Sequence, residues 1–164
     1  MTQKAGDRHG ELRVALGREV EAAGKVAETL SAARRSVETR DAPEYRRLLS
    51  EAAADFDALL RAAAQRNALV TAEARALGLP RAATLSDVIG VLGEGAASLR
   101  AQAADLRGEL GRVRREVRAH GLIARYGSAQ VSNLMQLSGH RRVAPAYGSR
   151  GQRTAAASRA ARTA

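Results

Sequence analysis

The chain has 164 residues and a formal net charge of +10 at pH 7. Ala and Leu dominate with 37 and 18 residues, only four residues are aromatic, and β-branched residues never form the short alternating runs that strands need. This composition excludes a sandwich, a barrel or a doubly wound sheet and predicts an all-α protein. Because there is no Cys and the three His lie far apart, disulfide frameworks and thiolate metal sites are also excluded.

Three long helices are predicted from apolar residues that recur at alternating steps of three and four. They cover about residues 10–40, 43–78 and 96–138, and about residues 79–95 are expected to connect the second helix to the third. Helices of this length must cover one another's apolar faces, so residues 1–138 are predicted to form an elongated antiparallel helical bundle or coiled coil. The Ala-rich contact positions bury little apolar area, which is compatible with either marginal stability or a homodimer.

Local signals place the ends of these helices. Asp41 and Pro43 are typical of a helix start, and Gly78 is typical of a helix end. The second helix has one apolar face, on which we place Leu49. Within the connector, Thr84 is a candidate start for a short helix, although the glycines that follow favour a bend over a continuous helix.

The third helix changes character after Val117. Its first apolar stripe continues through His120 and Gly127, which bury little surface, so we expect packing against the other helices to weaken there. A second stripe at helical spacing then appears, made of Ile123, Tyr126, Leu134 and Leu137. A second apolar face indicates a second partner, unless the bundle only rotates its contact face at this point.

The positive charge is concentrated towards the C-terminus. After Glu116 the chain has eight Arg and neither Asp nor Glu. Residues 139–164 hold too few apolar groups to offset the entropy cost of ordering, so we expect a basic tail that is disordered when free. These arginines would bind nucleic acid non-specifically, which is the alternative function. We disfavour it because the chain has neither zinc-finger spacing nor an aromatic-rich RNA-binding motif.

No set of residues is typical of an enzyme. Asp55 and Asp57 lie on different helix faces, and His120 has no second His one turn away. His9 and His140 lie near ends that we expect to be weakly structured. A lone Gly-Glu-Gly lacks the strand and the full fingerprint of a dinucleotide site. We therefore predict a non-enzymatic protein with no metal, cofactor or small-molecule substrate.

The chain also lacks signals for membranes or secretion. Its first residues have no apolar core of the kind found in signal peptides, and no run of about 18 apolar residues could span a bilayer. We therefore expect a cytoplasmic protein without membrane insertion.

One stretch carries a family resemblance. Residues 122–154 read LIARYGSAQVSNLMQLSGHRRVAPAYGSRGQRT, and they resemble the C-terminal signature of the FlgN family of flagellar export chaperones. In that family a Leu-Ile or Leu-Leu pair begins an apolar stripe, a glycine-containing break follows, and a Tyr-Gly-x-x-Gly element lies in a flexible tail. Residues 57–79 and the long Leu-rich helix are similar to the family's central helices, so the resemblance covers most of the chain.

The resemblance implies a cytoplasmic chaperone for the proteins that join the flagellar hook to the filament. Such a chaperone binds the C-terminal segments of these export substrates, prevents their premature association and delivers them to the export apparatus. We assign the contact to apolar side chains of the last helix and to the tail element: Leu122, Ile123, Tyr126, Val131, Leu134, Met135, Leu137, Tyr147 and Gly148. Whether Val131 and Leu134 are core or interface stays open at this stage.

Overall fold

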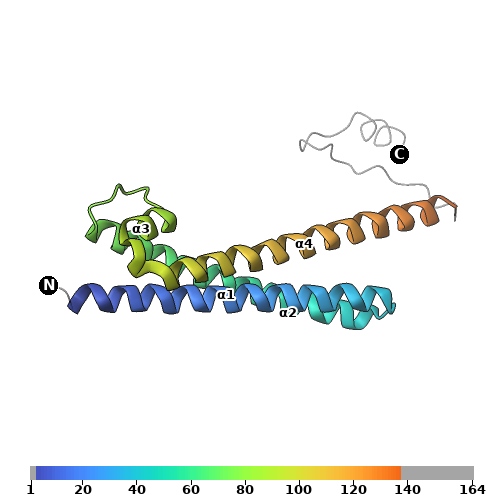
Figure 1. Ribbon diagram of the computed structural model, residues 1–164. Helices are drawn as coiled ribbons and strands as arrows, with labels where there is room; N and C mark the ends of the chain where they lie inside the picture. The colour runs from blue at the N-terminus through green and yellow to red at the C-terminus, as the bar shows by residue number, and fades with distance from the viewer. Residues whose placement is uncertain (1–2, 138–164) are drawn as a thin grey trace, which may run out of the picture. The chain divides into compact units, whose positions relative to one another are not determined.

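The computed structural model describes residues 3–137, with side chains from His9 to Gly93 and from Ala96 to Leu134. The described chain is all-α, as predicted (Figure 1). Its elements are α1 (Gln3–Glu38), α2 (Ala42–Ala76), α3 (Leu85–Leu92), the 3-10 helix η1 (Gly93–Ala96) and α4 (Ala97–Leu137). The chain divides into a first unit, Met1–Gly121, and a second unit, Leu122–Ala164, with the division inside α4. The predicted tail, residues 139–164, lies outside the described residues.

The turn between α1 and α2 confirms the predicted helix start. The Asp41 carboxylate accepts a hydrogen bond from the Glu44 N–H at 3.0 Å, and Pro43 occupies the first turn of α2. The preceding residue, Arg40, has a φ of +59°, and the Asp41 N–H donates to the Ser36 carbonyl at 2.8 Å. This bond pattern is a Schellman motif, whose left-handed position usually holds glycine. Arg47 donates two hydrogen bonds to Glu44, which hold the pKa of that carboxyl below its usual range.

The end of α2 has the same motif with the expected residue. Gly78 has a φ of +70°, and the Leu79 N–H donates to the Ala74 carbonyl at 2.8 Å. No side chain or backbone atom lies within 4 Å of the position that a Cβ at Gly78 would occupy. The glycine is therefore needed for its backbone conformation and not for space.

The predicted connector contains a helix. Thr84 caps α3 by accepting from the Asp87 N–H, while the Asp87 carboxylate accepts from the Thr84 N–H at 2.7 Å. This capping box was the candidate start seen in the sequence, so the description of residues 79–95 as a plain connector was incomplete. The Thr84 hydroxyl also donates to this carboxylate at 2.8 Å, and the bonds from the Thr84 N–H and hydroxyl lower the pKa of Asp87. Gly93, with a φ of +60°, ends the helix and begins η1.

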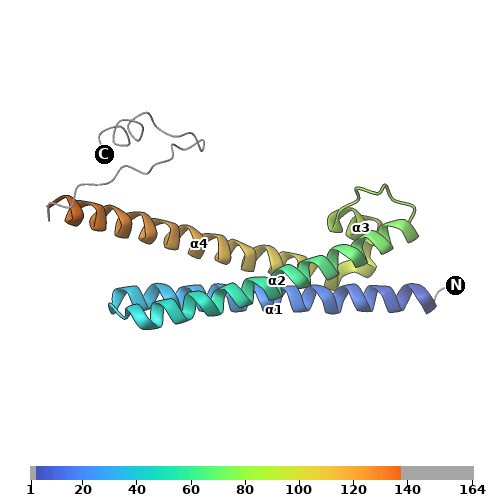
Figure 2. The same cartoon turned by 180° about the vertical axis from the view of Figure 1, so that it is seen from behind.

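The core of the first unit combines α1, α2, α3 and the beginning of α4. Helices α1 and α2 run side by side as an antiparallel hairpin (Figure 2). On α2, Leu48 and Leu59 are buried, and Leu49 is half-buried and packs against the core, so the predicted apolar face does include Leu49. Alanines fill many contact positions, which allows close helix approach. The larger buried apolar side chains are Leu12, Leu16, Val26, Leu30, Leu48, Leu59, Val70, Val88, Ile89, Leu99, Leu106 and Val113.

Three buried carboxylates lie along the interface of α1 and α2. Arg66 donates to both oxygens of Glu19 at 2.8 and 2.9 Å. Asp55 accepts from the Thr29 hydroxyl at 2.9 Å and pairs with Lys25, whose pKa this contact raises. The contacts made by residues later in α1 are with residues earlier in α2. All of them can therefore form together only when the two helices run antiparallel.

The third carboxylate corrects an expectation about the N-terminal end. Glu73 is buried and forms a 2.9 Å contact with the Nε2 atom of His9. We had expected His9 to lie in a weakly structured end, but it lies within α1 and reaches across to α2. A buried carboxylate without a partner is costly, so this contact stabilises the packing of the start of α1 against α2.

Candidate protein-binding surface

Burial along α4 decreases before the helix ends. Leu99, Leu106 and Val113 are buried in the core of the first unit, and Val113 is only 6% exposed. Val117, the next apolar position four residues further on, is 47% exposed, although apolar residues continue to recur at steps of three and four. The sequence therefore places this stripe correctly up to Val113, and the loss of packing begins slightly earlier than predicted.

The last strong contacts of α4 in the first unit are polar and come from His120. Its Nε2 atom lies 2.8 Å from the carbonyl oxygen of Leu30, and its Nδ1 atom lies 3.2 Å from the hydroxyl of Tyr45. A carbonyl only accepts, so Nε2 carries a proton, and in the neutral ring Nδ1 accepts from Tyr45. The two rings also stack, with centroids 5.8 Å apart. Sequence analysis could not find these partners, because each lies 75 or more residues away.

The second unit begins with the helical segment to which the sequence analysis assigned binding. Four of its large apolar side chains are exposed: Leu122 (53%), Tyr126 (71%), Val131 (57%) and Leu134 (64%). Ile123 is half-buried. We call these five residues the α4 stripe. Val131 and Leu134 are therefore exposed in the part of the chain that the structure describes.

Helix geometry defines the shape of the α4 stripe. At about 100° per residue, Ile123, Tyr126 and Leu134 fall within about 80° of one another round the helix. Leu122 and Val131 lie at the two edges, so the stripe covers about half of the circumference. The polar groups between these residues are neutral, apart from exposed Arg125. Ser128 donates to the Arg125 carbonyl at 3.0 Å, a bond within the helix itself.

The other four assigned residues have no described side chains. Met135 and Leu137 belong to the last turn of α4, but their side chains are outside the described set. Tyr147 and Gly148 are outside the described residues altogether. The structure thus brings five of the nine assigned residues together on one helical segment.

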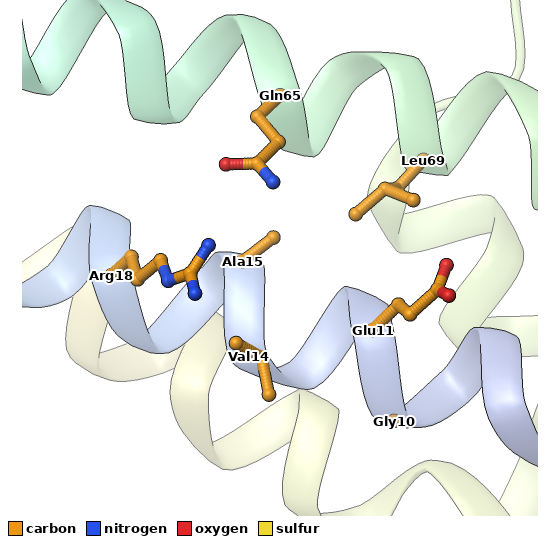
Figure 3. Close-up of a pocket in the computed structure, with 7 residues that line it drawn as sticks. All are labelled: Gly10, Glu11, Val14, Ala15, Arg18, Gln65 and Leu69. Atoms are coloured by element: carbon orange, nitrogen blue, oxygen red, sulfur yellow. The ribbon is translucent and has the colours of Figure 1, made fainter.

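A second candidate is a cleft between α1 and α2. Its volume is about 410 Å³, and Figure 3 shows Gln65 and Leu69 of α2 across the opening from residues of α1. Glu11 and Arg18 add charges of both signs, with Ala15 between them. No group of three or more His, Cys, Asp or Glu that could hold a metal occurs among the described residues. Nothing in this cleft brings an acid, a base and a nucleophile together, and none of the predicted site residues lies in it.

Two further findings bear on the kind of protein this is. Among the described residues, no helix combines the length and the apolar character needed to cross a membrane. No protein-family model, no curated protein and no solved structure matches the chain.

Proposed function

We propose that this protein is a cytoplasmic, non-enzymatic export chaperone of the FlgN type. It binds the C-terminal segments of the proteins that join the flagellar hook to the filament, keeps them apart and delivers them to the flagellar export apparatus. The observation that carries the proposal is the α4 stripe, in which four large apolar side chains stay exposed on one helical segment. The resemblance of residues 122–154 to the FlgN signature names the class of partner.

The physical reason is the cost of leaving apolar surface in water. A contiguous apolar patch on a helix is typical of a surface that another protein covers. An amphipathic partner segment that folds on contact would bury the stripe by helix packing. Each large side chain buried contributes about 1.5 to 3 kcal/mol, while association itself costs about 4 to 15 kcal/mol.

This balance favours binding that can be released. With four or five side chains buried, the gross gain is about 6 to 15 kcal/mol, which exceeds the cost of association by only a small margin and so gives weak, reversible binding. A chaperone that must hand its substrate to an export apparatus needs this range of affinity, because a much tighter complex would not dissociate in time.

Non-specific nucleic-acid binding is the second candidate, and one observation favours it. After Glu116 the chain carries eight Arg and no acidic residue. Such binding would weaken steeply with salt and would not need the α4 stripe. A chaperone complex held by apolar contacts would need the α4 stripe, and its affinity would change little with salt.

The test is titration calorimetry of the full chain against C-terminal peptides of hook–filament junction proteins, at low and high salt. We expect saturable binding that salt changes little, and we expect Leu134→Asp to weaken it at least about tenfold, because a carboxylate would have to be buried. Leu60→Asp is the matched control, since Leu60 on α2 is 66% exposed and Leu134 is 64% exposed.

Circular dichroism of both variants shows whether the helices remain. The proposal fails if Leu134→Asp binds the peptides as well as Leu60→Asp does. Absence of peptide binding, together with salt-sensitive binding to an arbitrary DNA duplex, would support the nucleic-acid candidate instead.

A further inference from the structure

Exposed charges are distributed differently on α4 than on the other two long helices. On α1, from His9 to its end, four acidic and four basic side chains are exposed, and on α2 two acidic and four basic side chains are exposed. On α4, from Ala97 to Gly121, six arginines are exposed, and Asp105 is the exposed acidic residue. This part of α4 therefore presents a positive surface, whereas α1 and α2 present charges of both signs.

Five of the six arginines share one face of α4. At about 100° per residue they fall within an arc of about 100°, and at a rise of about 1.5 Å per residue their row is about 27 Å long. We call this set the α4 basic face: Arg100, Arg107, Arg114, Arg115 and Arg118. The buried side chains of Leu106 and Val113 lie outside this arc, so the face is turned towards solvent.

The acidic residues of this part of α4 lie on the other side of the helix. Asp105, Glu109 and Glu116 are about 130° to 170° round the axis from the middle of the α4 basic face. Glu109 pairs with Arg112 at 2.9 Å, and Glu116 pairs with Arg34 of α1 at 3.2 Å. The carboxylates of this helix segment therefore do not interrupt the row of arginines.

The neutral residues within the α4 basic face are small, namely Ala97, Ala104 and Gly111. A helix that lies in a membrane interface needs side chains such as Leu, Phe or Trp on its buried face. Proteins that bind single-stranded nucleic acid stack its bases on aromatic side chains. The α4 basic face has neither kind of side chain, so its attraction for a partner depends on charge.

We propose that the α4 basic face binds the phosphate backbone of double-stranded nucleic acid without preference for sequence. A duplex carries a phosphate charge about every 1.7 Å along its axis, which places phosphates within reach of every arginine in a row about 27 Å long. The planar guanidinium group of arginine can donate two parallel hydrogen bonds to phosphate oxygens. Contacts of this kind position a protein on a duplex and read no bases.

This binding is a second activity that does not rest on the proposed function. The nucleic-acid candidate considered above depends on arginines after Glu116, most of which lie outside the described residues. Four of the five arginines of the α4 basic face precede Glu116, and all five belong to the first unit. The face shares no residue with the α4 stripe, so duplex binding and peptide binding can be tested apart.

The test is fluorescence anisotropy of a labelled DNA duplex of arbitrary sequence and about 24 base pairs, titrated with the full chain from about 0.05 M to 0.3 M NaCl. Contact of five arginines with phosphates predicts a slope of log K against log [NaCl] of about −4.5 or steeper. The triple variant Arg107→Gln, Arg114→Gln and Arg118→Gln should weaken binding about 10- to 100-fold at about 0.1 M NaCl. It should also make the slope shallower by about 2.7, because three phosphate contacts are lost.

The matched control is a triple variant of α2 with the same change in net charge. Arg46→Gln, Arg61→Gln and Arg75→Gln replace three exposed arginines that lie at least about 21 Å apart along α2 and form no continuous row. We expect this variant to change duplex affinity by less than about threefold, because these side chains are not within reach of the bound backbone. Circular dichroism shows whether both triple variants keep their helices.

Equal weakening of duplex binding by the two triple variants would overturn the proposal, because net charge alone would then explain the binding. An unchanged salt slope in the α4 variant would overturn it as well and would assign the binding to arginines elsewhere in the chain. Vesicles of phosphatidylcholine and phosphatidylglycerol in equal parts provide a further arm. If they bind more tightly than the duplex, and the α4 variant loses this binding, the face belongs to a lipid surface instead.

The same proteins separate this inference from the chaperone proposal. The triple variant of α4 should bind the junction peptides as tightly as the unchanged chain, and Leu134→Asp should bind the duplex as tightly. Absence of duplex binding would overturn the inference and leave the chaperone proposal standing. Duplex binding through the α4 basic face without any peptide binding would support the inference and reject the chaperone proposal.

Discussion

The two parts of α4 have the same helical backbone and opposite surroundings. From Ala97 to Val113 the apolar positions of the helix are buried against the other helices, whereas between Leu122 and Leu134 no described side chain is buried. Both parts keep apolar residues at helical spacing, so the spacing alone does not distinguish core from surface. The comparison teaches that a stripe of this kind becomes core only where a second element lies against it, and that otherwise it is available to another molecule.

The largest expected effect tests this contrast directly. Leu106→Ala should lower the free energy of unfolding by about 2 to 5 kcal/mol, because it leaves a cavity in the core of the first unit. Leu134→Ala should change it by less than about 0.5 kcal/mol, because Leu134 is exposed. Urea denaturation followed by circular dichroism measures both. Similar losses for the two variants would mean that the second part of α4 is packed like the first.

A smaller effect concerns the two helix ends that share a Schellman motif. Arg40→Gly should stabilise the first unit by about 0.5 to 1 kcal/mol, because glycine adopts the left-handed conformation without strain. Gly78→Ala should destabilise it by about 1 kcal/mol for the same reason. Thermal unfolding of the pair checks the opposite signs. Since neither position belongs to the α4 stripe, peptide affinity should stay constant, and a parallel change in affinity would argue against separate roles for the two units.

The smallest effect is a difference in acid response. The pKa of Asp87 is lowered by its bonds from Thr84, so the charged capping box stabilises α3 fully near neutral pH. That stability is lost as the pH falls below the ordinary aspartate value of about 3.9 and through the lowered pKa. Residues 117–137 contain no Asp or Glu, so this part of α4 has no corresponding side-chain carboxylate. An NMR pH titration should therefore show an acid-linked change at the Thr84 amide that Asp87→Asn removes, with no matching transition at the amides around Tyr126.

Much of the fold could be predicted because local chemistry specifies it. Asp41, Gly78 and Thr84 mark helix ends through hydrogen bonds and backbone conformations that involve only their near neighbours. The loss of apolar packing along α4 was predicted only approximately, because Val117 itself is already exposed and because His120, expected to weaken the contact, bonds to Leu30 and Tyr45. The sequence signals conflict at α3, because Thr84 favours a helix start whereas the glycines that follow it favour a bend. The glycines led to the prediction of a connector at residues 79–95.

For the candidate site, the residues could be predicted from the sequence, but the exposure of their side chains could not. The sequence indicated that Leu122, Tyr126 and Leu134 recur with helical spacing, and it could not say whether Leu134 packs inside the bundle. The exposure of a side chain depends on which elements lie against its face of the helix, and periodicity does not contain this information.

The sequence by itself determined the all-α class, most helix ends and the positions that could be apolar contacts, because these depend on propensity, capping and spacing over a few residues. Only the tertiary structure decided that Glu19, Asp55 and Glu73 are buried with partners from the neighbouring helix. It also decided that His120 bonds to Tyr45 and that the α4 stripe stays exposed. Such contacts join residues far apart in the chain, and their existence depends on the register in which whole helices pack.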